Sequence, residues 1–148
     1  MPTQDTTSGD ETQIRRLIEQ WAAALRAKDL EGVLATFAPG ARTYDLAPPL
    51  QQDPDGRRQA LAAWFPGFSA IGYEIGKDLD IVVGGDVAFC RSLNRLGGKL
   101  QSGGEFEIWV RVTMGFRKVD GAWKIAHAHT SVPFYMDGSF KAATDLHP

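Results

Sequence analysis

The sequence predicts an α+β fold in which three N-terminal helices pack on one face of a strongly curved sheet, mixed or antiparallel. Apolar residues recur at helical spacing through residues 10–65, whereas β-branched and aromatic runs with strand alternation dominate residues 71–132. Short glycine-containing turns separate the later runs, which favours hairpins over alternating βαβ units. Helices followed by hairpins are the pattern of an α+β domain.

The length and composition indicate one globular domain. The 148 residues suit a single core, which we place at residues 10–134, between a disordered tail over residues 1–9 and a C-terminal extension over residues 135–148. A net charge of −2 without a run of Lys or Arg gives no electrostatic support for nucleic acid or an anionic membrane as a partner. No apolar run approaches the roughly 18 residues of a membrane span. The acidic N-terminus does not resemble a signal peptide, so we expect a cytoplasmic protein.

The helices are predicted from caps and apolar stripes. Asp10 is the predicted N-cap of the first helix. The apolar stripe of that helix consists of Ile14, Leu17, Ile18, Trp21 and Leu25. A second helix follows Asp29 and ends at Pro39, and a third covers residues 56–65. Between them lie a short strand at residues 41–46 and a loop with three prolines, which we expect to be exposed near a cavity mouth.

Four further strands are predicted. They cover residues 71–83, 86–96, 105–118 and 123–132, and the Asp-Gly pair at 120–121 is a strong hairpin signal between the last two. Strand alternation places His127 and His129 on the face that carries Trp123 and Ile125, so both imidazoles are expected to face a partly apolar interior. Because the pKa of histidine lies near neutrality, this pair is the first candidate for acid–base chemistry.

Several stretches together resemble a known family. They are the helical region IRRLIEQWAAALRAKDLEGVLATFAPGA, the strand with Tyr44 and Asp45, the helix that begins GRRQAL, and the closing DGAWKIAHAHTSVP. Over residues 11–134 the chain is similar to the SnoaL-like and ketosteroid-isomerase-like proteins of the NTF2-like superfamily. The resemblance implies a cone, in which a bent sheet wraps against three helices around a pocket open at one end, often in a homodimer. Because the superfamily includes isomerases, cyclases, dehydratases and association domains, the resemblance does not imply one activity.

Four residues are the catalytic candidates. His129 is the candidate acid or base and His127 its partner, acting on a carbonyl compound that forms an enolate. The alternatives are hydrogen-bonded structural histidines, or a metal site completed by Asp45, but no third ligand is fixed and we predict neither a metal nor a cofactor. Asp45 is either a desolvated proton acceptor or a turn cap before the proline loop. Tyr44 either donates a hydrogen bond to an oxyanion or packs.

The ligand-binding candidates are aromatic and polar side chains. They are Trp64, Phe68, Tyr73, Trp109, Arg111 and Asn94. The aromatic rings would form the walls of a pocket, or else plain core. Arg111 would anchor a carboxylate if its face lines the pocket, or form an ion pair across a dimer if it does not. Asn94 has the same two readings.

The sequence therefore predicts a pocket for a small hydrophobic molecule, cyclic or aromatic. Cofactor-independent isomerisation or cyclisation is the activity that the candidate residues would support. The alternative is a non-catalytic module for ligand binding or homodimerisation. No Gly-rich phosphate loop, dinucleotide fingerprint or nucleophile elbow occurs, so nucleotide cofactors are not expected.

Overall fold

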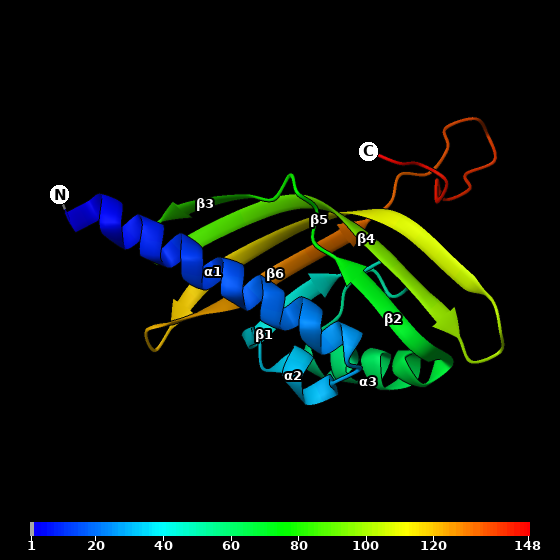
Figure 1. Ribbon diagram of the computed structural model, residues 1–148, viewed down its shortest axis with the longest axis horizontal. Helices are drawn as coiled ribbons and strands as arrows, with labels where there is room; N and C mark the ends of the chain where they lie inside the picture. Colours follow the sequence, from blue (N-terminus) through cyan, green and yellow to red (C-terminus); the bar gives the residue numbers. More distant parts are fainter. Residues whose placement is uncertain (1) are drawn as a thin grey trace.

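Three helices lie against one side of a curved six-stranded sheet in the computed structural model, which describes residues 2–148 (Figure 1). The helices are α1 (Pro2–Arg26), α2 (Leu30–Leu34) and α3 (Pro54–Trp64), and a short 3-10 turn, η1 (Phe65–Gly67), follows the last. The strands are β1 (Phe37–Tyr44), β2 (Phe68–Glu74), β3 (Asp80–Gly84), β4 (Val87–Leu100), β5 (Glu105–Val119) and β6 (Ala122–Ser131). Helix α1 runs across the sheet, and α2 and α3 lie together at one end of it (Figure 1).

The sheet is mixed. Its strand order is β1-β6-β5-β4-β2, and β3 pairs with the first half of β4 while β2 pairs with the second half. Strands β1 and β6 are parallel, and the other neighbours are antiparallel. The predicted α+β class, with a strongly curved sheet wrapped against three helices, is confirmed.

The core lies between α1 and the face of the sheet toward it, here called the inner face. All five residues of the predicted apolar stripe of α1 are buried. From the sheet, Met114, Phe116 and Ile125 are among the most deeply buried side chains of the core. The removal of this apolar surface from water is the main force that holds the helix on the sheet.

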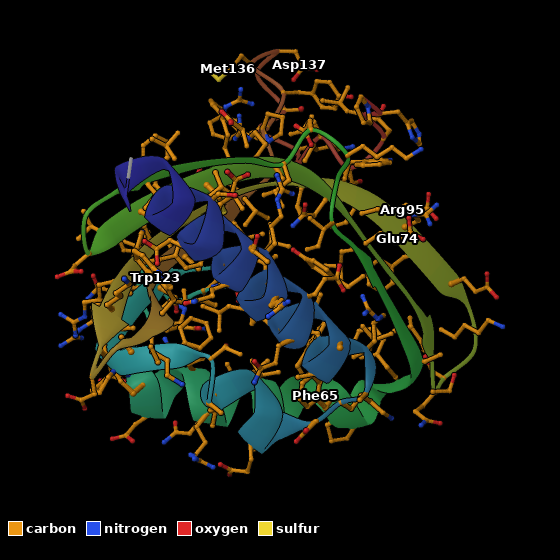
Figure 2. All side chains as sticks on the ribbon, turned by 60° about the vertical axis from the view of Figure 1, so that its left-hand side comes forward. Phe65, Glu74, Arg95, Trp123, Met136 and Asp137 are labelled. Carbon is orange, nitrogen blue, oxygen red and sulfur yellow. The ribbon has the colours of Figure 1, made fainter. Side chains whose placement is uncertain are left out.

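Asp10 does not cap α1. The helix begins at Pro2, and Met1 of the predicted tail lies outside the described residues. The buried Asp10 carboxylate instead accepts a hydrogen bond from Trp123 Nε1 at 3.0 Å and lies 3.1 Å from Lys118 Nζ. The bond from Trp123 and the Lys118 charge lower the pKa of Asp10. The carboxylate therefore ties the first helix to the hairpin between β5 and β6, where Figure 2 labels Trp123.

The second helix is shorter than predicted. It ends at Leu34, and the backbone from Phe37 onward pairs with β6 as β1. The amide of Ile125 donates to the Thr36 carbonyl at 2.9 Å, so pairing with a distant strand overrides the local helical pattern.

The predicted strand over residues 71–83 is two strands, β2 and β3. At the interruption the Gly76 amide donates to Asn94 Oδ1, and the Leu93 amide donates to Asp78 Oδ1, each at 3.0 Å. The side-chain oxygens of Asn94 and Asp78 thus accept the hydrogen bonds that backbone carbonyls would accept in a regular sheet. A Cβ atom at Gly76 would lie 1.9 Å from the Leu93 carbonyl oxygen, so the close approach requires glycine.

Candidate functional site

A β-bulge in β6 turns the two histidines away from the interior. Ile125 and His127 pair with consecutive residues of β5, which leaves Ala126 as an extra residue. Ile125 and Ala128 are both buried on the inner face although they lie three positions apart. His127 and His129 therefore lie on the opposite face, here called the outer face, and the prediction that they face the interior is wrong.

Tyr44 lies beside both histidines on the outer face. It stands opposite His129 in the parallel pairing of β1 with β6. Its ring meets the His127 ring at a centroid distance of 4.7 Å and the His129 ring at 5.4 Å, both edge to face. His127 Nδ1 lies 2.6 Å from the Arg42 carbonyl oxygen, which can only accept, so this nitrogen carries the proton. The ring of His127 is thus held in place by the backbone.

A pocket lies at the ends of β1 and β6, and we call it the mouth pocket. Its volume is about 740 Å³. It is lined by Tyr44, Asp45, Leu46, Ala47, Pro48, Pro49, Leu50, Gln51, His129, Thr130, Ser131 and Val132. Three of the four predicted catalytic residues thus line one pocket, and one wall is the proline loop. The fourth, His127, does not line the pocket, but its ring packs against the ring of Tyr44, which does.

Asp45 is exposed, as the turn interpretation requires. Its Oδ1 accepts a hydrogen bond from the Leu46 amide at 2.7 Å, which orders the start of the proline loop. Asp45 is therefore not the desolvated proton acceptor of the other interpretation. The side chain nevertheless brings a negative charge to the same pocket as the His129 imidazole.

Tyr73 and Asn94 meet each other on the inner face. Asn94 Nδ2 donates to the Tyr73 hydroxyl at 3.0 Å, and Ser92 Oγ donates to Asn94 Oδ1 at 2.7 Å. All three are buried, and Trp21 packs edge-on against the Tyr73 ring. Burial raises the pKa of Tyr73, and the Asp45 charge adds to this, so the phenol remains protonated. These two ligand-binding candidates form a structural network inside the cone.

The remaining four ligand-binding candidates lie in two other places. Trp64 and Phe68 pack against each other at a centroid distance of 4.7 Å, near the turn after α3. Trp109 and Arg111 lie on the outer face, and Arg111 is exposed. Arg111 Nε donates to Ser131 Oγ at 3.2 Å, which brings its charge to the edge of the mouth pocket. The six candidates therefore do not form one site.

The comparison with family models decides the family. A model described as a SnoaL-like domain matches residues 14–135. The chain belongs to the SnoaL-like family. No curated protein matches the chain.

Solved structures of similar fold agree with this assignment. An NTF2-like protein of unknown function from Pseudomonas putida KT2440 is 30% identical, with a TM-score of 0.85 over 95% of this chain and 98% of that chain. A protein assigned as a scytalone dehydratase from Novosphingobium aromaticivorans is 19% identical, with a TM-score of 0.81 over 95% of each chain. A ketosteroid isomerase-like protein from Erwinia carotovora atroseptica is 21% identical, with a TM-score of 0.69 over 81% of this chain and 93% of that chain.

A second hollow of the SnoaL-like domain lies where β2, β4 and β5 run together. Its volume is about 520 Å³, and Gly72, Gly97 and Gly98 contribute to its lining. Arg95 at its edge pairs with both Glu74 and Glu107, and Figure 2 shows the first of these pairs on the strands. Because the guanidinium is already neutralised by carboxylates, this hollow is a poorer polar site than the mouth pocket.

The described residues of the SnoaL-like domain offer neither a cluster of metal ligands nor a helix that could span a membrane. Among the described side chains, no group of three or more His, Cys, Asp or Glu residues is placed to hold a metal ion. None of the helices within residues 2–148 combines the length and the apolar character that a membrane span requires.

Arg57 was not among the site residues predicted from the sequence. It is buried between α3 and β1, with only 5% of its surface exposed. The available signal was its spacing, because Ala60, Leu61 and Trp64 follow it at three, four and seven positions and share its helix face. A charged residue on the apolar stripe of a helix is unusual and points to a special role.

Proposed function

We propose that this SnoaL-like protein binds a small cyclic organic molecule in the mouth pocket. The observation that carries the proposal is the meeting of His129, Tyr44 and Asp45 in one pocket of about 740 Å³. That volume lies within the usual range of small-molecule sites. Apolar side chains of the proline loop would contact the ring of the ligand, and the polar groups would orient it.

The same residues support acid–base catalysis. The imidazole of His129 is exposed and makes no hydrogen bond to another described residue, so it is available to a ligand. We propose that it removes a proton beside a carbonyl group and returns it elsewhere, which is an isomerisation without a cofactor. Tyr44, and Arg111 at the pocket edge, would stabilise the enolate oxygen. The isomerase-like and dehydratase names of the structural neighbours agree with such chemistry.

Replacing His129 tests the acid–base proposal. With 3-cyclohexen-1-one as probe, the proton would leave C2 and return at C4, giving the conjugated 2-cyclohexen-1-one. We expect the protein to accelerate this conversion and His129→Gln to lower the rate by about 100-fold, the usual contribution of one acid–base group. The ultraviolet absorbance of the conjugated enone measures the rate.

The third histidine supplies the matched control. His147 is exposed in the C-terminal extension and does not line the mouth pocket, so His147→Gln should retain the full rate. Binding of the probe is measured separately from shifts of the imidazole resonances. Binding without turnover would leave a ligand-binding module, whereas an unchanged rate in His129→Gln would contradict the catalytic role.

A second function, self-association, is favoured by apolar side chains on the outer face. Val82, Val87 and Phe89 are 45%, 60% and 50% exposed, and Val82 stands opposite Phe89 across β3 and β4. Beyond β6, Phe134 and, in the C-terminal extension, Met136 and Phe140 are exposed as well, and Figure 2 shows Met136 projecting away from the helices. Exposed apolar groups on the side of the sheet away from the helices would suit a homodimer.

Replacing Phe89 tests self-association. We expect the 16.2 kDa chain to sediment as a dimer and Phe89→Glu to sediment as a monomer, because a charge cannot be buried in an apolar contact without a partner. Arg16→Glu, on the exposed side of α1, introduces the same side chain away from the outer face and should leave the dimer intact. A wild-type protein that sediments as a monomer would rule this function out.

A further inference from the structure

The guanidinium of Arg57 is buried beside the first strand of the sheet. Arg57 belongs to the first turn of α3 and is 5% exposed. Its Cζ atom lies 4.0 Å from the centroid of the Phe37 ring, and the aromatic face is an attractive surface for a cation. The charge is thus enclosed on one side by an aromatic ring of β1.

Only one side of the guanidinium is hydrogen-bonded. Nη1 donates to the Ala41 carbonyl at 3.1 Å and to Thr43 Oγ1 at 3.2 Å. Nε is buried and has no acceptor, and no described residue accepts from Nη2. Nε and Nη2 together form the edge of a guanidinium that holds both oxygens of a carboxylate. The edge suited to a carboxylate is therefore the edge without a partner, and a ligand reaches the buried Nε only when the side chains around it move.

The charge of Arg57 also lacks an ionic partner among the described residues. The neighbouring Arg58, which is exposed, pairs with Glu31. The Asp53 carboxylate, the charged group that acts most on Arg57, caps α3 by accepting from the Gly56 amide at 2.7 Å. Buried charges in folded proteins are normally paired and hydrogen-bonded, because an unpaired charge pays its desolvation cost without compensation. Within the part of the chain that the structure describes, Arg57 therefore lacks the anion that normally pairs with a buried guanidinium.

We propose that the free edge of Arg57 binds the carboxylate of a small organic acid. The site lies behind the wall of the mouth pocket, because Thr43 precedes Tyr44 and pairs with Gln52, the residue after Gln51. Two backbone hydrogen bonds hold Gln52 to Thr43, but the contact between their side chains is long, at 3.4 Å, so we expect the Gln52 side chain alone to move aside for the ligand. This site adds a class of ligand to the protein and does not depend on turnover by His129.

Benzoate and benzamide are the matched probes, because they share a shape and differ in charge. We expect benzoate to bind at least about tenfold more tightly than benzamide in calorimetric titrations, since only the carboxylate makes a charged bidentate contact. At about 100 times its dissociation constant, benzoate should raise the melting temperature by roughly 5 to 10 °C. Equal binding of the two probes would overturn the proposal.

Variants locate the benzoate site. Arg57→Met keeps a long unbranched side chain without the charge, and we expect it to bind benzoate no better than benzamide. Arg58→Met removes the neighbouring exposed charge and should keep the wild-type preference. If His129→Gln abolishes benzoate binding while Arg57→Met does not, the acid binds in the mouth pocket alone, which overturns the Arg57 site but leaves the proposed function standing.

A measurement on the wild-type protein avoids dependence on the folding of Arg57→Met. The Nε–H resonance of an arginine reports directly on its hydrogen-bond acceptor. With labelled arginine, benzoate should shift one slowly exchanging Nε–H signal strongly, and benzamide should not. If no Nε–H signal responds to saturating benzoate, the proposal is wrong.

Discussion

Deletion of Lys124 is expected to unfold the protein or to leave it barely stable. Trp123 and Ile125 are both buried on the inner face, two positions apart in the regular part of β6. Without Lys124 they would be adjacent, and strand alternation would turn one of them, with the part of β6 that it belongs to, onto the outer face. Loss of the Ile125 contacts alone costs about 2 to 5 kcal/mol, a large part of the 5 to 15 kcal/mol of a typical domain.

The matched control is the deletion of Ala126, the extra residue of the bulge in the same strand. It leaves Ile125 and Ala128 two positions apart, so strand alternation keeps both on the inner face, and the loss of stability should be much smaller. Chemical denaturation monitored by circular dichroism measures both variants. Equal losses in the two deletion variants would mean that side-chain alternation along β6 does not set the cost.

Replacement of Gly76 by alanine is expected to give the second large effect. Its Cβ would lie 1.9 Å from the Leu93 carbonyl oxygen, so the backbones at the interruption between β2 and β3 would have to separate. The separation would weaken the bonds from Gly76 to Asn94 and from Leu93 to Asp78 together. We expect a loss of about 3 kcal/mol in the free energy of unfolding.

Gly84, the last residue of β3, provides the comparison. A Cβ atom there meets nothing within 4 Å, so Gly84→Ala should be neutral or slightly stabilising in the same denaturation experiment. Similar losses in the two variants would mean that the change from glycine to alanine itself, and not the close approach at Gly76, sets the cost.

Features that depend on local periodicity could be predicted from the sequence. The apolar stripe of α1 is buried as expected, because helical spacing alone decides which side faces the sheet. The turn at Asp120 and Gly121 has positive φ values of 53° and 82°, as a two-residue hairpin requires. In both places the local structure that the sequence favours is the one found in the complete fold.

The positions of the candidate site residues could not be derived in the same way. The faces of His127 and His129 depend on a bulge, and a single extra residue reverses strand alternation without leaving a clear mark in the sequence. Tyr44 meets His129 only because β1 and β6 are parallel neighbours, and Arg57 meets β1 only because α3 packs there. The residues were recognisable by chemistry, but their grouping depends on long-range pairing.

The bond between Asp10 and Trp123 has a consequence for how the chain acquires its structure. It joins residues 113 positions apart, and the contact of Arg42 with His127 spans 85 positions. Such contacts cannot form until nearly the whole chain has left the ribosome, and loop closure over these lengths slows folding. During synthesis the apolar sides of α1 and β1 therefore remain exposed to solvent until β6 has been made. Pairing with β6 then covers them and protects the new chain from aggregation.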